Sequence, residues 1–201
     1  MPMKVMHIIP SAFNYFDDIK AKAFDVVDGL SKIGVEVEAF TLQYGGVTKS
    51  VKESIKQSSP RVHTYAGSTN ADGLTYSLEG FDIVHLHCPF LGAASRVVQW
   101  KKTHQNIPLV ITYYRDVQFV DIFSLFIKIY NAIYLPKLFK LADMVVCQNF
   151  DNFRTKGGAR YMSEDKKIIA LDEVLVDKSL GVFSGNESLA AKMLLMYNNL
   201  V

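Results

Sequence analysis

Short apolar segments alternate along this chain with longer amphipathic ones, and no other feature of the sequence restricts the fold as strongly. The short segments are rich in Val and Ile, which is typical of buried strands, whereas the longer segments repeat apolar residues at helical spacing. In residues 17–33, for example, Ile19, Ala23 and Val26 recur at that spacing before Gly34 ends the helix. The alternation predicts a doubly wound α/β fold of about six or seven parallel strands, with helices on both sides.

The elements can be placed along the sequence from this alternation. The expected strands are Lys4–Ile9, Val35–Leu42, Arg61–Tyr65, Asp82–His87, Leu109–Tyr113, Met144–Cys147 and Lys167–Leu171. The expected helices are Asp17–Ile33, Leu91–His104, Phe119–Leu141 with a break near Pro136, Asn149–Lys156 and Leu189–Leu200. We expect residues 1–201 to form a single domain, in which residues 172–201 are a loop and a last helix that docks back onto it.

The composition is that of a globular domain without a strong electrostatic bias. The 201 residues have a formal net charge of +2, with 49% hydrophobic and 21% charged residues, so neither disorder nor nucleic-acid binding is indicated. The two cysteines, Cys88 and Cys147, lie in or beside apolar segments and are expected to be reduced thiols. No signal peptide or membrane span is recognisable. This predicts a cytoplasmic protein, with peripheral association at the inner face of a membrane as an alternative.

Phosphate-binding and hydrolase signatures are missing from the sequence. The turn after the first strand, PSAFNYFDD, contains no glycine and matches neither the Rossmann nor the P-loop pattern. No GxSxG elbow occurs either. We therefore expect no dinucleotide or other cofactor.

The segment FDIVHLHCPF places His85 and His87 on the same face of one strand. A metal site needs a third ligand and usually a fourth, and no HExxH or paired CxxC motif is found. We therefore expect no metal site. His85, inside the strand, is interpreted as a structural histidine, whereas His87, at the strand end, either lines a ligand cleft or is structural too.

Ligands of open parallel sheets bind outside the carboxyl ends of the strands, so the residues that follow each strand are the candidate site. Tyr114, Arg115 and Asp116 follow one strand, and Asn149 follows another. A guanidinium at Arg115 could clamp a phosphate or carboxylate, and the alternative is a surface contact with an acidic residue. Asp116 could act as a base, although it has no visible partner.

Several phrases, in this order and spacing, resemble the N-terminal domain of family 4 (group 1) glycosyltransferases, which have the GT-B fold. They are MKVMHIIPSAF, LSKIGVEVEAFTL, FDIVHLHCPF, IPLVITYYRD and LFKLADMVVCQNFDNFR, and the resemblance as a whole covers roughly residues 3–170. The resemblance implies hexosyl transfer from a nucleotide-sugar, with this domain on the acceptor side of the cleft. By position it implies substrate contacts from Ser11, Phe13 and Asn14 in the first loop, from His87, and from Tyr114, Arg115 and Asp116.

The sequence departs from the family pattern in three respects. The first loop lacks the paired glycines, Tyr114 or Arg115 stands where the family has a histidine, and the 201 residues leave no room for a second, donor-binding domain. We therefore expect the chain to be inactive alone and to be completed by a donor-domain protein or a homodimer. The expected acceptor is a sugar or a lipid-linked sugar. For the second, Phe119–Leu141 could lie against a membrane, and the alternative is an ordinary buried helix with snorkelling lysines.

Two other functions remain open from the sequence. One is a non-catalytic sugar-binding or protein-interaction module of the same fold. The other is an unrelated small-molecule enzyme of flavodoxin-like shape.

Overall fold

A parallel sheet organises the chain, as predicted. The computed structural model describes residues 2–10, 17–42, 63–67, 78–91, 94–116, 124–155, 157–161, 168–174 and 186–201. Every strand pair within the sheet is parallel. The seven strands are β1 (Lys4–Ile9), β2 (Glu36–Leu42), β3 (His63–Gly67), β4 (Ile83–Cys88), β5 (Leu109–Tyr113), β6 (Met144–Cys147) and β7 (Ile168–Ala170).

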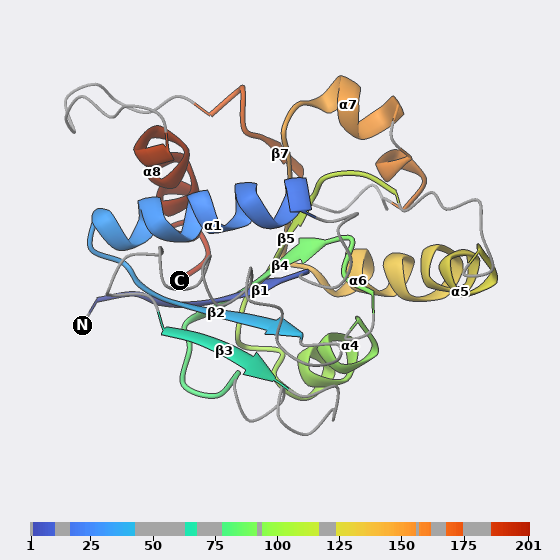
Figure 1. Ribbon diagram of the computed structural model, residues 1–201, viewed down its shortest axis with the longest axis horizontal. Helices are drawn as coiled ribbons and strands as arrows, with labels where there is room; N and C mark the ends of the chain where they lie inside the picture. Colours follow the sequence, from blue (N-terminus) through green and yellow to red (C-terminus); the bar gives the residue numbers. More distant parts are fainter. Residues whose placement is uncertain are drawn as a thin grey trace.

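Helices cover both faces of this sheet (Figure 1). They are α1 (Asp17–Lys32), α4 (Ala94–Thr103), α5 (Ser124–Ile129), α6 (Leu135–Leu141), α7 (Phe150–Thr155) and α8 (Asn186–Tyr197). Side chains alternate between the faces, so Val5 and Ile9 pack toward α1 and α8, whereas Met6 and Ile8 pack toward α4 and α6. The doubly wound α/β prediction is confirmed.

The strand order is β3-β2-β1-β4-β5-β6-β7. The chain thus adds β2 and β3 on one side of β1, and then β4 to β7 in succession on its other side. Their pairing aligns His7 with His85. In folds of this kind the point where the order reverses, here between β1 and β4, is where ligands bind, outside the carboxyl ends of the strands.

Glycine ends α1 by a specific hydrogen-bond pattern. Gly34 has a φ of 94°. Its N–H donates to Ser31 O, and the N–H of Val35 donates to Leu30 O. This is a Schellman cap, which requires the left-handed conformation that glycine adopts without strain, and it lets the chain enter β2 directly.

The predicted helix Phe119–Leu141 is divided in the structure, whose description begins at residue 124 within it. A π-helical turn, Tyr130–Tyr134, separates α5 from α6, and the N–H of Leu135 donates to Tyr130 O. Pro136 lies in the first turn of α6. Because proline has no N–H, it cannot continue an α-helical ladder, and the wider turn stands just before it.

Other predicted boundaries moved by a few residues. The strand expected at Arg61–Tyr65 is β3 and extends to Gly67, because β3 pairs with β2 as far as Leu42. The last helix begins at Asn186, before the expected Leu189.

The last helix, α8, lies beside α1 on one face of the sheet (Figure 1). Ala190, Met193 and Tyr197 are buried there in one cluster with residues of α1 and the sheet. Among the residues that the structure describes, no helix combines the length and the apolar character needed to cross a bilayer.

Candidate functional site

A pocket of about 390 Å³ lies at the carboxyl ends of β5, β6 and β7. This volume is within the range of small-molecule sites, roughly 300–1,000 Å³. Side chains of α1, α7 and α8 complete its wall. The charged and amide side chains of the lining are Asp18, Lys22, Arg115, Gln148, Asn152, Asp172 and Lys192.

Arg115 lines this pocket and forms an ion pair there. Its guanidinium donates from Nη1 to Asp18 Oδ2 over 3.0 Å and from Nη2 to Asp18 Oδ1 over 3.1 Å. This two-bonded geometry is the one that guanidinium and carboxylate groups favour. The sequence left open whether Arg115 contacts a ligand or an acidic residue. The structure places it against Asp18, with both groups at the pocket wall.

Asp116 is buried away from the pocket and holds three groups together. Its carboxylate accepts hydrogen bonds from the hydroxyls of Tyr113 and Tyr161 and pairs with Arg160. Burial and the adjacent Asp116 carboxylate raise the pKa of Tyr113, and burial raises that of Tyr161 to about 12. Both tyrosines therefore stay protonated and donate hydrogen bonds to Asp116. The Asp116 carboxylate thus anchors the surrounding side chains.

Gly157 allows this ion pair to form. Its φ of +92° lies in the left-handed region, and a Cβ at this position would overlap the Arg160 guanidinium and the Asp116 carboxylate. In the sequence, Gly157 is only the residue that follows the expected helix Asn149–Lys156.

His87 is fully buried and reaches the pocket only through another side chain. Its Nδ1 lies 3.0 Å from the hydroxyl of Tyr114, and its Nε2 lies 3.0 Å from Nδ1 of His7. Tyr114 and Thr112 line the pocket, and Thr112 Oγ1 is hydrogen-bonded to His85 Nε2 over 2.7 Å. Contact between His87 and a substrate stays a prediction.

Burial keeps all three of these histidines neutral. It lowers the pKa of His7 to about 3 and lowers those of His85 and His87 well below their ordinary value, with mutual repulsion among the rings adding to the effect on His85 and His87. His85 is buried as expected for a structural histidine. Its Nδ1 is hydrogen-bonded to the hydroxyl of Tyr197 from α8.

The remaining predicted contacts are Asn149 and three residues of the loop after β1. Asn149 is a helix cap, because its Oδ1 accepts the N–H of Asn152 over 2.7 Å at the start of α7. Ser11, Phe13 and Asn14 lie outside the described residues. Cys88 and Cys147 are buried free thiols, and burial raises their pKa values to about 12 and about 11.

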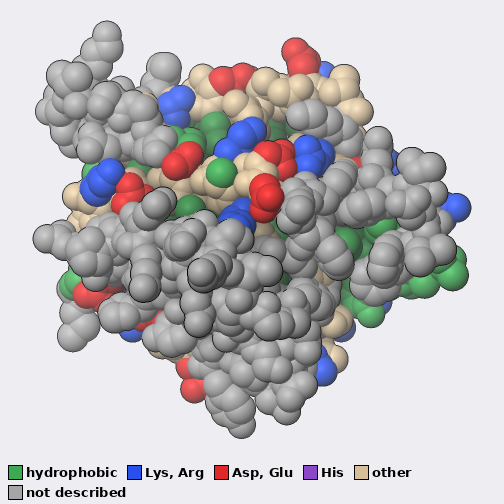
Figure 2. Space-filling view, in the orientation of Figure 1, with side chains coloured by type: hydrophobic (Ala, Val, Ile, Leu, Met, Phe, Trp, Pro, Cys, Tyr) green, Lys and Arg blue, Asp and Glu red, His purple; other side chains and the backbone are tan. Residues whose placement is uncertain are grey.

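Four charged pocket residues were missed in the sequence: Asp172 follows β7, and the other three lie on helices. Asp18 and Lys22 belong to α1, and Lys192 belongs to α8, where its Nζ donates to Leu171 O over 2.6 Å. Charged residues on amphipathic helices usually face solvent, so nothing in the local pattern singles them out. Figure 2 shows acidic and basic side chains interspersed over the position of α1, not separated into patches of one sign.

Comparison with known proteins identifies the family of this chain. The sequence matches the model of glycosyltransferase family 4 over residues 23–149, which is more than half of its 201 residues. The chain belongs to glycosyltransferase family 4. The matched part runs from α1 through β6 and ends at Asn149. The resemblance seen in the short sequence phrases is thus confirmed.

Solved structures share the fold of this family 4 chain. A UDP-glucosyltransferase from Polygonum tinctorium has a TM-score of 0.59 at 11% identity, over 85% of this chain and 52% of its own. An alpha-glucosyltransferase in complex with UDP and DNA has a TM-score of 0.57 at 11% identity, over 85% and 42%. A Medicago truncatula protein complexed with UDP-glucose has 0.55 at 10% identity, over 85% and 51%.

At these identities the likeness establishes the fold, which is that of a GT-B N-terminal domain. The family 4 chain spans about half the length of these structures. No curated protein matches the chain.

Proposed function

We propose that this chain is the acceptor-side domain of a glycosyltransferase that uses a nucleotide-sugar. A donor domain, on a partner chain or in a second copy, would complete the site. Transfer would join the anomeric carbon of the sugar to an acceptor hydroxyl oxygen and break the bond from that carbon to the diphosphate. The nucleoside diphosphate would leave, and the hydroxyl proton would pass to a base of the completed site.

The pocket at the carboxyl ends of β5, β6 and β7 carries this proposal. Its wall combines the rings of Tyr113 and Phe153 with amide, carboxylate and cationic side chains. Such a lining suits a polyhydroxylated ligand, because apolar surface supplies contact area while a few polar groups fix orientation. A pocket of this kind in a family 4 fold supports acceptor binding more directly than any other feature of the described residues.

A non-catalytic sugar-binding or interaction module is the second candidate. Arg115 is engaged by Asp18, and the segment after β1 lacks glycine. Both features favour a pocket that binds without transferring. If the chain is such a module, it should bind sugars without any turnover of nucleotide-sugar, whether or not a donor domain is added.

The deciding experiment measures binding and turnover together. Nucleotide-sugars and free mono- and disaccharides are screened by thermal shift, and release of nucleoside diphosphate is measured with and without an isolated GT-B donor domain. Release that requires both proteins supports the split transferase. Sugar-induced shifts without any release support the binding module, and no response to any ligand in either format refutes both.

The pocket assignment predicts the effect of Arg115→Ala. A hydrogen bond to a charged group is worth about 1.5–3 kcal/mol, so the variant should weaken binding of the identified ligand by roughly 10- to 150-fold. Isothermal titration measures this. Arg96→Ala is the matched control, because Arg96 is exposed on α4, and it should bind as the unaltered chain does. Equal affinity in the two variants would remove Arg115 from the site.

A lipid-linked acceptor is favoured by one exposed surface. Leu125, Ile129 and Ile133 are 68%, 41% and 44% exposed, and their spacing of four residues places them along one side of α5 and the π-helical turn. Figure 2 shows hydrophobic side chains at the right-hand edge, over the position of α5 in Figure 1. Exposed lysines on the same helical segment are Lys128, Lys137 and Lys140. Apolar side chains flanked by lysines suit an anionic bilayer surface.

The membrane proposal predicts a loss of vesicle binding in a double variant. Burying one Leu or Ile side chain is worth about 1.5–3 kcal/mol, so Leu125→Ser with Ile133→Ser should reduce partitioning into phosphatidylglycerol vesicles by at least about tenfold. Co-sedimentation measures the bound fraction. Val201→Ser, which changes another exposed apolar side chain, should leave it unchanged. Unaltered partitioning of the double variant, or no binding by the unaltered chain, contradicts the proposal.

A further inference from the structure

Three of the five histidines of the chain meet beneath α1 and α8, although they come from two strands far apart in sequence. His7 lies on β1, and His85 and His87 lie on β4. The pairing of the two strands sets His7 directly beside His85. All three side chains are 0% exposed, and one ring nitrogen of each lies within 4.8 Å of those of the other two.

The hydrogen bonds among these rings leave one nitrogen unpaired. His7 Nδ1 is bonded to His87 Nε2, and His87 Nδ1 is bonded to Tyr114. Whichever way the protons are placed along this chain, His7 Nε2 has no hydrogen-bond partner among the residues that the structure describes. A buried polar atom left without a partner costs about 1–3 kcal/mol, so the hydrogen bonds among the rings do not fully satisfy this cluster.

We propose that His7, His85 and His87 bind one divalent transition-metal ion, with Zn²⁺ the ion best suited to the site. Imidazole nitrogen is a preferred ligand of Zn²⁺, and three histidines with a further position form a recognised ligand set. The inference is independent of sugar transfer and concerns residues behind the pocket wall.

The distances fit this ion with a small rearrangement. At Zn–N bonds of about 2.0–2.1 Å in tetrahedral geometry, two ligand nitrogens lie roughly 3.3–3.4 Å apart. His7 Nδ1 and His87 Nε2 are 3.0 Å apart, so a slight separation of these rings admits the ion. His85 must turn one nitrogen away from Thr112 or Tyr197, each of which is now hydrogen-bonded to it.

The surroundings already hold the rings in place as partners of metal ligands usually do. His87 can donate its Nδ1 proton to the Tyr114 hydroxyl while its Nε2 binds the ion. His85 can keep its hydrogen bond to one of its two hydroxyl partners, Tyr197 or Thr112. Thr112 and Tyr114, the partners of His85 and His87, also line the pocket, so we expect the ion to enter from that side.

The test begins with the unaltered chain, stripped of metal by a chelator and dialysed. It should bind one Zn²⁺ per chain by isothermal titration. With Co²⁺ it should give the intense visible absorption of a four-coordinate ion, which an equivalent of Zn²⁺ abolishes. A weak, six-coordinate cobalt spectrum would overturn the proposal without recourse to any variant.

The variant His7→Phe keeps a ring of similar size and removes both nitrogens. Loss of a residue that merely orients a ligand costs about 10- to 100-fold in metal affinity, so loss of a ligand should weaken Zn²⁺ binding by at least that much. His104→Ala is the control, because His104 is outside the cluster and bonds to Trp100 O. Zn²⁺ affinity that is the same in folded His7→Phe and in the unaltered chain, with circular dichroism confirming the fold, would refute the site.

Discussion

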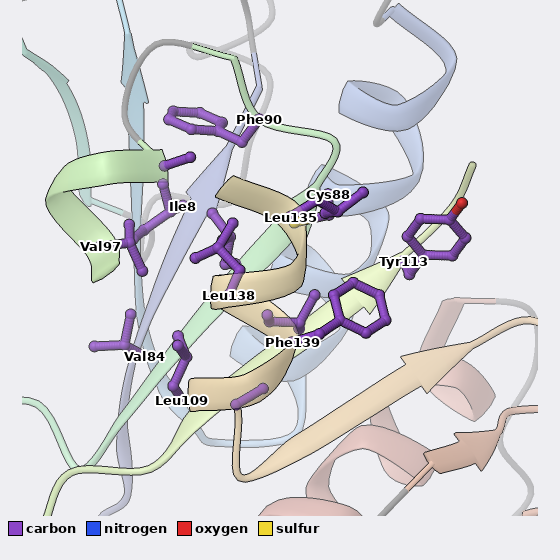
Figure 3. Close-up of a cluster of buried hydrophobic side chains, with 14 of the residues drawn as sticks. Ile8, Val84, Cys88, Phe90, Val97, Leu109, Tyr113, Leu135, Leu138 and Phe139 are labelled. Carbon is purple, nitrogen blue, oxygen red and sulfur yellow. The ribbon is translucent and has the colours of Figure 1, made fainter. Parts of the chain in front are cut away.

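Replacing Phe139 with alanine is expected to lower the free energy of unfolding by about 3–5 kcal/mol, because a fully buried aromatic side chain is lost and a cavity remains. Phe139 is 0% exposed. Its ring meets Tyr113 edge-on, with centroids 5.6 Å apart, and stacks near Phe153 at 6.3 Å. Figure 3 shows Phe139 on α6, directed at Tyr113 at the end of β5. Urea denaturation followed by circular dichroism measures the loss.

Leu125→Ala provides the matched control for this change. Leu125 belongs to the same helical segment but is 68% exposed, so its truncation should change the free energy of unfolding by no more than about 0.5 kcal/mol. A loss below about 1.5 kcal/mol for Phe139→Ala would mean that α6 does not pack on the sheet as described.

Replacing Asp116 with alanine is expected to cost about 2–4 kcal/mol, since it removes the common acceptor of Tyr113, Tyr161 and Arg160. The buried Tyr113 hydroxyl then loses its hydrogen bond to Asp116. The Arg160 side chain is 64% exposed, so its ion pair adds little to this total. Thermal and urea unfolding measure the effect. Asp116→Asn keeps one acceptor oxygen, so its stability should lie between those of Asp116→Ala and the unaltered chain.

Asp28→Ala is the control for Asp116→Ala. Asp28 pairs with Lys32 one turn away on the exposed side of α1, where such pairs are worth about 0.3–0.5 kcal/mol. If Asp116→Ala were as mild as Asp28→Ala, the Asp116 carboxylate would not be the anchor of the segment that contains Gly157 and Arg160. That result would favour direct contact between Asp116 and a ligand.

Both predictions bear on the pocket. Tyr113 and Phe153 line it. Behind the wall, both rings contact Phe139, and the Tyr113 hydroxyl also donates to Asp116. A rigid wall holds polar groups in place for a ligand. Loss of ligand binding in Phe139→Ala or Asp116→Ala would therefore indicate that the pocket wall has changed shape. Loss of ligand binding in Arg115→Ala at unchanged stability would indicate that Arg115 contacts the ligand.

The histidines illustrate how far local pattern extends. The spacing of His85 and His87 predicted correctly that they share one face of a strand. Their third neighbour, His7, is 80 positions from His87, and only the register of β1 against β4 brings it there. With two histidines in view, a metal site could not be argued from the sequence, because the third ligand was missing from the pattern.

Arg115 and Asp18 show the same limit at the pocket. The position of Arg115 after an apolar strand predicted a residue at the carboxyl edge of the sheet, and it lies there. Its partner Asp18 is 97 positions away, at the start of α1, and reads in the sequence as an ordinary acidic residue in a first helical turn. Asp116 was equally visible as a carboxylate, but its burial among Tyr113, Tyr161 and Arg160 was not.

The sequence by itself determined the order and type of the elements, the parallel sheet and the family. These depend on the periodicity of apolar residues and on short phrases, both of which are local. The tertiary structure alone decided that Arg115 is paired with Asp18, that Asp116 is an anchor, and that His7 joins His85 and His87. Each of these contacts depends on strand register and on how helices pack across the sheet, which arise from the summed burial of many side chains and leave no mark at any single position.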